Sequence, residues 1–381
     1  MKRVYLDHNA TTAPDPRVLE RVHERARVDY GNPSSAHLEG QHSRRLIEES
    51  RSALARVINA FDREIIFTGG GTEANNLAIK GAVEARSDKG RHLMASTIEH
   101  QSVRRVFLDL ERRGFQVSWL PVDKNGVVEL DYLEKHLRDD TILVSVMLAN
   151  NETGAVQPVK EIANLAHGKN ALFHSDAVAA LGKIPVNAEE LGADLMTFSG
   201  HKIYAFKGVG ALYLRRGTEL VPQMLGGHQE HGHRAGTENM PGILSFAEAV
   251  NLFRAEGAQW LANISRLRDM LEQGIASRFP SARINGQAAK RAPNTCNVRF
   301  PGVDGENLLM NLDALGVSVS TGAACQTGAT DPSHVLAGMG LSEEEARGTI
   351  RISLGKDNTE EEIKFLLDAL DKTVGRIKKE R

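Results

Sequence analysis

Short apolar runs alternate with helical patterns through the first two thirds of the sequence, and this alternation constrains the fold more than any other feature. Most of the runs are apolar or β-branched throughout, as in strands buried on both faces of a parallel sheet. Helical patterns such as Val159–His167 lie between several runs, so βαβ units and a doubly wound, mostly parallel sheet are expected. The predicted strands of this sheet are Glu64–Thr68, His92–Ser96, Val117–Val122, Ile142–Leu148, Leu172–Ser175, Leu195–Ser199 and Gly210–Leu214.

The rhythm changes after about Pro241. A long helical stretch, Ile243–Phe279, precedes three further strand candidates and a final amphipathic helix. The pattern predicts a large α/β domain over residues 14–250. A smaller α+β domain is expected over residues 251–381, with residues 1–13 folding back onto it. The three strand candidates of the smaller domain are Asn297–Phe300, Ser318–Thr321 and Thr349–Leu354.

Composition excludes several classes of protein. The 381 residues include 47 basic and 49 acidic side chains, so a net charge of −2 offers no field for nucleic acid or an anionic membrane. The longest near-apolar run, Ile142–Ala149, is too short to span a bilayer, and Asp7 interrupts any signal-like N-terminus. Two cysteines in so long a chain exclude a disulfide framework and favour a reducing cytoplasm. We therefore expect a cytoplasmic protein with no nucleic acid or membrane partner.

A glycine-rich turn is the first candidate anion site. Gly69, Gly70 and Gly71 end a strand candidate, and a helical pattern begins at Thr72. Glycines let backbone N–H groups approach an anion, and the N-terminus of a helix favours negative charge. The alternative is an ordinary strand–helix turn in which Thr72 is only an N-cap. The turn matches neither the Walker A nor the dinucleotide pattern, so by itself it leaves both interpretations open.

Two polar residues follow other buried strands. Lys202 ends a buried run beside Ser199 and His201, where a desolvated amine is a good nucleophile for a Schiff base and its neighbours can donate to a phosphate. Asp176 ends another run, at the sheet edge where open α/β folds bind ligands. A carboxylate there can pair with a pyridine nitrogen. The alternatives are an exposed loop lysine and a helix-capping aspartate.

The two cysteines lie in different surroundings. Cys325 sits in a run of small and polar residues after a strand candidate, which favours an accessible thiol over a buried one. Cys296 begins a strand candidate, and a structural role is favoured there.

Arg351 and a histidine cluster complete the candidate groups. Arg351 lies between two isoleucines in a predicted strand, where its planar guanidinium can bind a carboxylate, unless it points outward on the polar face. His228, His231 and His233 are close in sequence, but their spacing matches no known zinc arrangement, so no metal is expected.

Together these groups suit pyridoxal 5′-phosphate bound to an α-amino acid. The whole chain from Tyr5 onward resembles the cysteine desulfurases of the NifS/IscS group, in the class-V aminotransferase family of fold-type I enzymes. This resemblance implies the aspartate aminotransferase-like fold, with a mostly parallel seven-stranded sheet and a smaller C-terminal domain. The stretches that carry it are Tyr5–Thr12, Gly31–Ser35, Ala149–Gly154 and Arg234–Asn239.

The resemblance implies a role for each matching residue. Lys202 would hold the cofactor covalently, Asp176 would pair with the ring nitrogen, His100 would stack on the ring and move protons, and Asn151 would lie by the phenolic oxygen. The phosphate would be held by Gly71, Thr72, Ser199 and His201, with Thr237 of the second subunit of a homodimer.

It also implies the reaction. Arg351, with Asn32 nearby, would hold the carboxylate of L-cysteine, and Cys325 would take the substrate sulfur as a persulfide, leaving alanine. The sulfur would pass to an acceptor protein, such as an iron–sulfur scaffold or a tRNA-thiolation enzyme. A selenocysteine lyase and a catalytically weakened sulfur-trafficking scaffold remain as alternatives.

Three positions depart from the usual pattern of this group. Ala179 stands where a glutamine usually touches the phenolic oxygen, Ala205-Phe206 replaces Gly-Pro after the lysine, and His228 interrupts a glycine run. These departures suggest a specialised or attenuated member.

Overall fold

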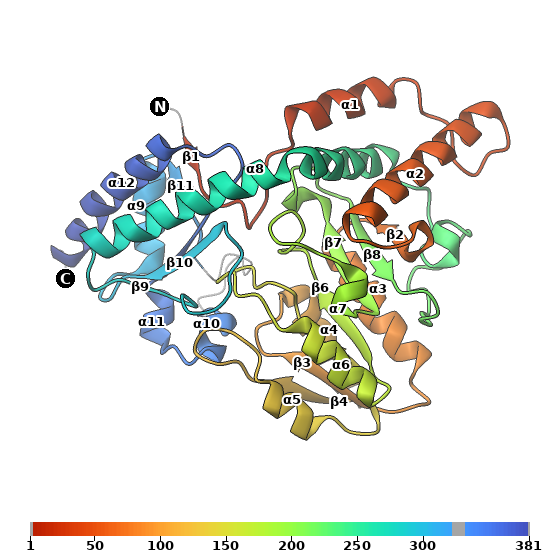
Figure 1. The fold of residues 1–381 in the computed structure, drawn as a ribbon, viewed down its shortest axis with the longest axis horizontal. Coiled ribbons are helices and arrows are strands. Elements are labelled where there is room, and N and C mark those ends of the chain that lie inside the picture. The colour runs from red at the N-terminus through yellow and green to blue at the C-terminus, as the bar shows by residue number, and fades with distance from the viewer. Residues whose placement is uncertain (1–2, 322–331, 380–381) are drawn as a thin grey trace.

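The computed structural model describes residues 3–321 and 332–379, and its largest element is a seven-stranded sheet (Figure 1). The strands lie in the order β2-β8-β7-β6-β5-β3-β4, and only β8 runs antiparallel to its neighbours. The predicted mostly parallel sheet is thereby confirmed. Its strands are β2 (Ile65–Thr68), β3 (His92–Ser96), β4 (Gln116–Leu120), β5 (Thr141–Ser145), β6 (Leu172–Asp176), β7 (Leu195–Ser199) and β8 (Gly210–Leu214).

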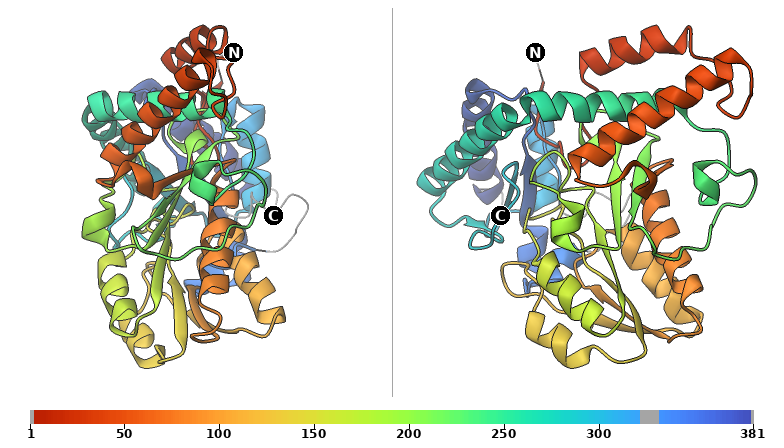
Figure 2. Two further views of the ribbon diagram at one scale, coloured as in Figure 1. Left: turned by 90° about the vertical axis from the view of Figure 1, so that its right-hand side faces the viewer. Right: turned by 45° about the vertical axis from the view of Figure 1, so that its right-hand side comes forward.

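Helices cover both faces of this sheet. Figure 2 shows, in its left view, the sheet nearly edge-on between α3 (Gly71–Ala85) and α4 (Gln101–Arg112) on one side and α6 (Val159–Gly168) on the other. Successive strand residues alternate between the two layers. In β7, for example, Leu195 belongs to the hydrophobic cluster under α3 and α4, while Met196 belongs to the opposite cluster. Burial on both faces explains why these strands are apolar throughout.

A 39-residue helix, α8 (Met240–Arg278), connects the sheet to a second body. Its first turns pack into the main core through Ile243 and Phe246, and its last turns pack into a separate cluster through Leu267 and Leu271. The second body contains an antiparallel sheet of order β12-β10-β9 and a two-stranded parallel pair of β1 with β11. Its strands are β1 (Val4–Tyr5), β9 (Arg283–Ile284), β10 (Thr295–Arg299), β11 (Val317–Ser318) and β12 (Thr349–Ser353).

The remaining helices complete the two bodies. Those of the first are α1 (Pro16–Ala26), α2 (Leu38–Val57), α5 (Leu130–His136), α7 (Ala188–Leu191) and the 3-10 turns η1 (Asp62–Glu64), η2 (Gly200–Lys202) and η3 (Glu230–Gly232). The later helices are α9 (Gly305–Ala314), α10 (His334–Gly338), α11 (Glu343–Arg347) and α12 (Glu360–Lys379).

Packing of α10 differs from the expectation for the C-terminal third. Val335 and Leu336 of α10 belong to the main core cluster, although the sequence pattern assigns residues 251–381 to the smaller domain. A Cβ placed on Gly338 would lie 3.3 Å from Thr97 Oγ1, so α10 sits directly on the turn that follows β3. The domain limits themselves stay a prediction. No helix of the described residues is long and apolar enough to cross a membrane.

Candidate active site

A cavity of about 290 Å³ lies where the parallel strands end. It brings together residues that the sequence separates by as much as 342 positions, from Asn9 to Arg351. Those that follow β2, β3, β5, β6 and β7 meet because these strands all end at one edge of the large sheet. The predicted site residues that line it are Gly71, Thr72, His100, Asn151, Asp176, Ser199, His201, Lys202 and Arg351.

Backbone rather than side chain forms the anion end of this cavity. Gly70 is the N-cap of α3 and has φ 149°, a conformation that favours glycine. A Cβ on Gly71 would lie 2.9 Å from Val178 Cγ2, so the close approach also requires glycine. Thr72 lies inside α3, and the alternative that it is the N-cap is wrong. A 15-residue helix that points its N-terminus at a cavity, with Ser199 beside it, suits a phosphate.

Asp176 ends β6 and is held from two sides. Its Oδ1 accepts a hydrogen bond from Val178 N at 2.9 Å, and its Oδ2 accepts one from Asn75 Nδ2 at 2.8 Å. Thr197 Oγ1 donates to Asn75 Oδ1 at 2.6 Å, which fixes the orientation of the amide. These bonds hold the carboxylate in one orientation, as the partner of a ring nitrogen requires. Asn75 was not predicted, although a polar side chain on the buried face of α3 was a signal for it.

His100 caps the N-terminus of α4. Its Nδ1 accepts a hydrogen bond from Ser102 N at 3.2 Å and lies 2.8 Å from Ser102 Oγ. Burial lowers the pKa of His100, the positive charge of Lys202 lowers it further, and the nearby carboxylate of Asp176 acts in the opposite direction. The ring is therefore neutral at physiological pH in this cavity.

Lys202 extends from η2 toward the N-terminal segment. Its Nζ donates to Asn9 O at 2.5 Å and Ala10 O at 2.7 Å. A second lysine, Lys183, also lines the cavity, and its Nζ donates to Lys202 O at 3.1 Å. Burial, together with the charge of Lys202, lowers the pKa of Lys183 to about 7. Lys183 was not predicted, although its position in the apolar run Ala177–Ile184 was a signal for it.

Arg351 points into the cavity. Only 3% of it is exposed, so the alternative of an outward-facing charge is wrong. Its Nη2 lies 2.7 Å from Asp7 Oδ1 and its Nη1 donates to Asn151 O at 3.2 Å. A planar guanidinium held in the wall of this cavity is suited to binding a carboxylate. Asp7, which balances the charge of Arg351, was not predicted.

His201 and Ala179 complete the wall. His201 Nδ1 lies 3.1 Å from Thr11 Oγ1, and burial, with the charge of Lys202, lowers the pKa of His201 to about 4. A bound dianion would favour the charged ring. Ala179 lines the cavity and places a methyl group where a longer donor is usual in the resembled group.

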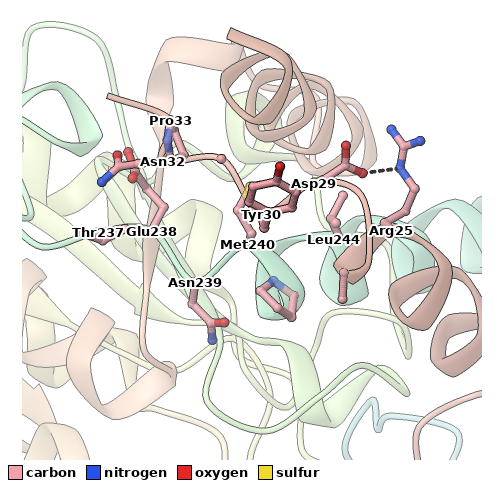
Figure 3. Close-up of a pocket in the computed structure, with 13 residues that line it drawn as sticks. Arg25, Asp29, Tyr30, Asn32, Pro33, Thr237, Glu238, Asn239, Met240 and Leu244 are labelled. Atoms are coloured by element: carbon pink, nitrogen blue, oxygen red, sulfur yellow. Dashed lines mark ion pairs between the residues drawn. The ribbon is translucent and has the colours of Figure 1, made fainter. Parts of the chain in front are cut away.

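Two predicted residues lie in another place. Asn32 and Thr237 line a second cavity, of about 450 Å³, together with Tyr30 and Met240 (Figure 3). Asn32 Oδ1 accepts a hydrogen bond from Ser34 N at 2.9 Å, and Thr237 is exposed. Within one chain neither residue lines the cavity of Arg351 and Lys202. Their assigned roles stay predictions, and both require a second subunit or a movement of the chain.

One of the two cysteines falls within the described residues. Cys296 in β10 is a fully buried free thiol whose pKa is raised by burial, which confirms the structural interpretation. Cys325 lies outside the described residues. In the described part of the chain no group of three or more histidine, cysteine, aspartate or glutamate side chains is arranged to hold a metal ion.

A family comparison agrees with this geometry. The Aminotransferase class-V profile matches residues 4–366 of the chain. The chain belongs to the class-V aminotransferase family. It is 44% identical to the cysteine desulfurase IscS of Dictyoglomus turgidum, with 99% of this chain and 96% of that protein covered.

Solved structures give the same result for this member of the class-V aminotransferase family. A NifS-like protein superposes with a TM-score of 0.92 at 39% identity, covering 98% of this chain and 100% of the other. A structure described as SspA in complex with cysteine superposes with a TM-score of 0.82 at 34% identity, covering 93% and 100%. The predicted NifS/IscS resemblance and the predicted fold class are confirmed.

Proposed function

We propose that this chain is a cysteine desulfurase that uses pyridoxal 5′-phosphate to remove sulfur from L-cysteine. One observation carries the proposal: a single cavity joins the amine of Lys202, an immobilised Asp176, a glycine-lined helix N-terminus and the guanidinium of Arg351. These are the partners of an aldehyde, a pyridine nitrogen, a phosphate and an α-carboxylate. The cysteine desulfurase names of full-length relatives support the same activity.

The residues of the cavity fit the cofactor. Lys202 would hold it covalently, Asp176 would pair with its ring nitrogen, and Gly71, Thr72, Ser199 and His201 would surround its phosphate. When bound, the cofactor supplies an electron-poor ring that accepts the electrons of a broken bond at the α-carbon.

The chain's own groups then position the substrate and move protons. Arg351 holds the carboxylate of L-cysteine, and Asp7 and Asn151 keep its guanidinium in place. Lys202 would be the base for the α-proton of the substrate, and neutral His100, in the wall of the same cavity, would donate a hydrogen bond to the substrate. The thiolate of Cys325 attacks the substrate sulfur. An S–S bond forms as the Cβ–S bond breaks, and Cβ gains a proton, so that alanine and a Cys325 persulfide result.

The proposal also includes a second subunit and a protein that accepts the sulfur. We propose a homodimer in which Thr237 and Asn32 complete the site of the other subunit, because both lie away from the cavity of their own chain. We also propose that a sulfur-accepting protein of iron–sulfur assembly or tRNA thiolation takes up the persulfide sulfur. The reducing cytoplasm suits a thiol that must remain free.

Measurement of alanine and sulfide from L-cysteine, with mass spectrometry of Cys325, tests the proposal. We expect alanine in a one-to-one ratio with sulfur, a mass increase of one sulfur atom on Cys325, and no turnover for Cys325→Ala despite an unchanged cofactor absorbance. Cys296→Ala is the matched control and should keep its activity. Turnover of L-selenocysteine alone would indicate a selenocysteine lyase, and absence of cofactor binding would indicate a scaffold.

A further inference from the structure

A buried hydrogen-bond relay runs beneath the cavity floor. Asn75 of α3 is completely buried, and each polar atom of its amide has a partner. Oδ1 accepts from Thr197 Oγ1 at 2.6 Å, and Nδ2 donates to Asp176 Oδ2 and to Ser102 Oγ, each at 2.8 Å. Because Oδ1 receives the threonine hydroxyl and Nδ2 faces a carboxylate, the amide has only one satisfactory orientation.

The relay continues from Ser102 to His100. Ser102 Oγ accepts a hydrogen bond from the Asn75 amide, so the hydroxyl hydrogen of Ser102 remains available to donate a hydrogen bond. His100 Nδ1 lies 2.8 Å from this oxygen and 3.2 Å from the backbone nitrogen of Ser102. The backbone N–H can only donate, so Nδ1 must be an acceptor and carries no proton. In the neutral ring the proton is therefore on Nε2.

We infer that Asn75 and Ser102 are positioning residues that hold His100 as the Nε2–H tautomer and thereby make it a hydrogen-bond donor toward the cavity. The chemical meaning of this relay rests on the proposed function, although the relay itself does not. Nδ1 is occupied by Ser102, so Nε2 is the nitrogen left to face a substrate. A ring that presents N–H there can donate a hydrogen bond to a substrate but cannot accept one at that nitrogen.

The same amide also serves Asp176. One N–H of the Asn75 amide donates a hydrogen bond to Asp176, the carboxylate that would pair with the cofactor nitrogen. The other donates a hydrogen bond to Ser102, which orients His100. Asn75 therefore holds both Asp176 and, through Ser102, His100 in their positions beside the cavity. A substitution there should disturb both, whereas a substitution of Ser102 should disturb His100 alone.

Nitrogen-15 NMR of the holoenzyme, labelled at its histidine side chains, tests the inference directly. The signal of His100 is assigned by subtracting the spectrum of His100→Gln. We expect the wild-type protein to show the Nε2–H tautomer. Ser102→Ala removes the shorter of the two Nδ1 hydrogen bonds and keeps only the 3.2 Å bond from the backbone, and Asn75→Ala leaves the serine hydroxyl without its fixed orientation. Each variant should therefore convert a measurable fraction of His100 to the Nδ1–H form, whereas Ser102→Thr should keep the wild-type spectrum.

Asn76→Ala is the matched control, because within the described residues the Asn76 side chain donates only to Thr72 O on the same helix. It should leave the His100 tautomer unchanged. If Asn75→Ala does not fold, Ser102→Ala decides the question, since it removes a single hydroxyl. A wild-type spectrum with the proton on Nδ1, or a tautomer unchanged in Ser102→Ala, would overturn the inference.

Kinetics provide a second readout. We expect kcat of Ser102→Ala with L-cysteine to fall about tenfold with KM little changed, as a fraction of the 10²–10⁴ that positioned acid–base groups contribute. If the protein had no activity on L-cysteine, the proposed function would fail while the NMR result stood. The two failures are thus distinguishable.

Discussion

Lys183 brings a second amine into the interior of the protein beside Lys202. Its only recorded hydrogen bond among the described residues is to Lys202 O, and no described carboxylate pairs with it. Burial therefore opposes its protonation, and the charge of Lys202 adds to the effect, so the pKa of Lys183 falls to about 7 from an ordinary value of 10.5. Between these two values the unfolded chain binds the proton more tightly than the folded chain does.

Stability should consequently depend on pH through Lys183. Its burial destabilises the fold fully below a pKa of about 7, and the penalty disappears as pH rises toward 10.5. We expect Lys183→Met to raise the free energy of unfolding of the cofactor-free protein at pH 7 by about 1–4 kcal/mol. Urea titrations from pH 7 to 10 measure it, and the gain should shrink steadily with pH. Exposed Lys169→Met serves as the control.

Glu99 shows the opposite dependence. It is completely buried, its Oε1 accepts from Met147 N at 2.8 Å, and its Oε2 has no partner among the described residues. Burial raises the pKa of Glu99 to about 8, so its contribution to stability is present below pH 4.5 and is lost as pH rises to 8. Glu99→Gln should flatten this decline, as seen in unfolding midpoints from pH 5 to 8. An unchanged slope would contradict the assignment.

At the scale of elements, a buried ion pair ties the loop around η3 to the edge of the large sheet. Arg51 of α2 donates to Glu230 with Nη1 at 2.7 Å and Nη2 at 3.0 Å, and Glu230 Oε2 also accepts from Phe67 N in β2. Glu230 adopts φ 46°, which an ordinary side chain tolerates only where neighbours hold it. This pair therefore connects three segments that are distant in sequence.

Breaking this pair should be costly. Arg51→Met leaves the Glu230 carboxylate buried without its counterion, so we expect a loss of about 3–5 kcal/mol in the free energy of unfolding. Arg45→Met, on the same helix, removes a long contact to Glu49 between two exposed side chains and should change nothing measurable. Urea denaturation compares the two variants. Equal stability of both would show that the buried pair contributes nothing.

At the scale of the whole molecule, α8 connects the two bodies, and Lys356 makes contacts between segments of both. The Lys356 amine lies 3.1 Å from Asp15 Oδ2 and faces the rings of Tyr204 and Trp260 at 5.2 and 5.3 Å. Residues from α8, the N-terminal segment and the segment after β12 thus converge beside the active site. The cavity of Lys202 needs this convergence, because Arg351 lies in β12 whereas Lys202 follows β7.

The second cavity leads to a prediction about assembly. Tyr30 lines it, with Asn32 and Thr237, and is 78% exposed. Such an exposed aromatic side chain is typical of a surface covered by a partner. We expect Tyr30→Asp to shift the proposed homodimer toward monomer in sedimentation velocity experiments. Phe365→Asp, in α12 at the opposite end of the molecule (Figure 1), should leave the dimer intact. A monomeric wild-type protein would contradict the proposal.

The sequence by itself determined the elements of this protein. Burial on both faces leaves a local record of apolar residues, so the predicted strand Leu195–Ser199 matches β7, and the predicted helix Ile243–Phe279 lies within a few residues of α8. The apolar run Ile142–Leu148 extends past β5, which ends at Ser145, because Val146–Leu148 stay buried after the strand ends. The family motifs identified most of the residues that line the cavity, because each motif is a short stretch that can be recognised without knowing what it contacts.

Only the tertiary structure decided which side chains meet. The pair of Asp7 with Arg351 joins residues 344 positions apart, and the bond from Asn75 to Asp176 spans 101. Such contacts depend on strand order and on the crossing of the chain between strands, which leave no periodic signal in either segment. Periodicity reports the burial of each residue, whereas the hydrogen bonds that orient His100 and Asp176 arise only when separate elements pack together.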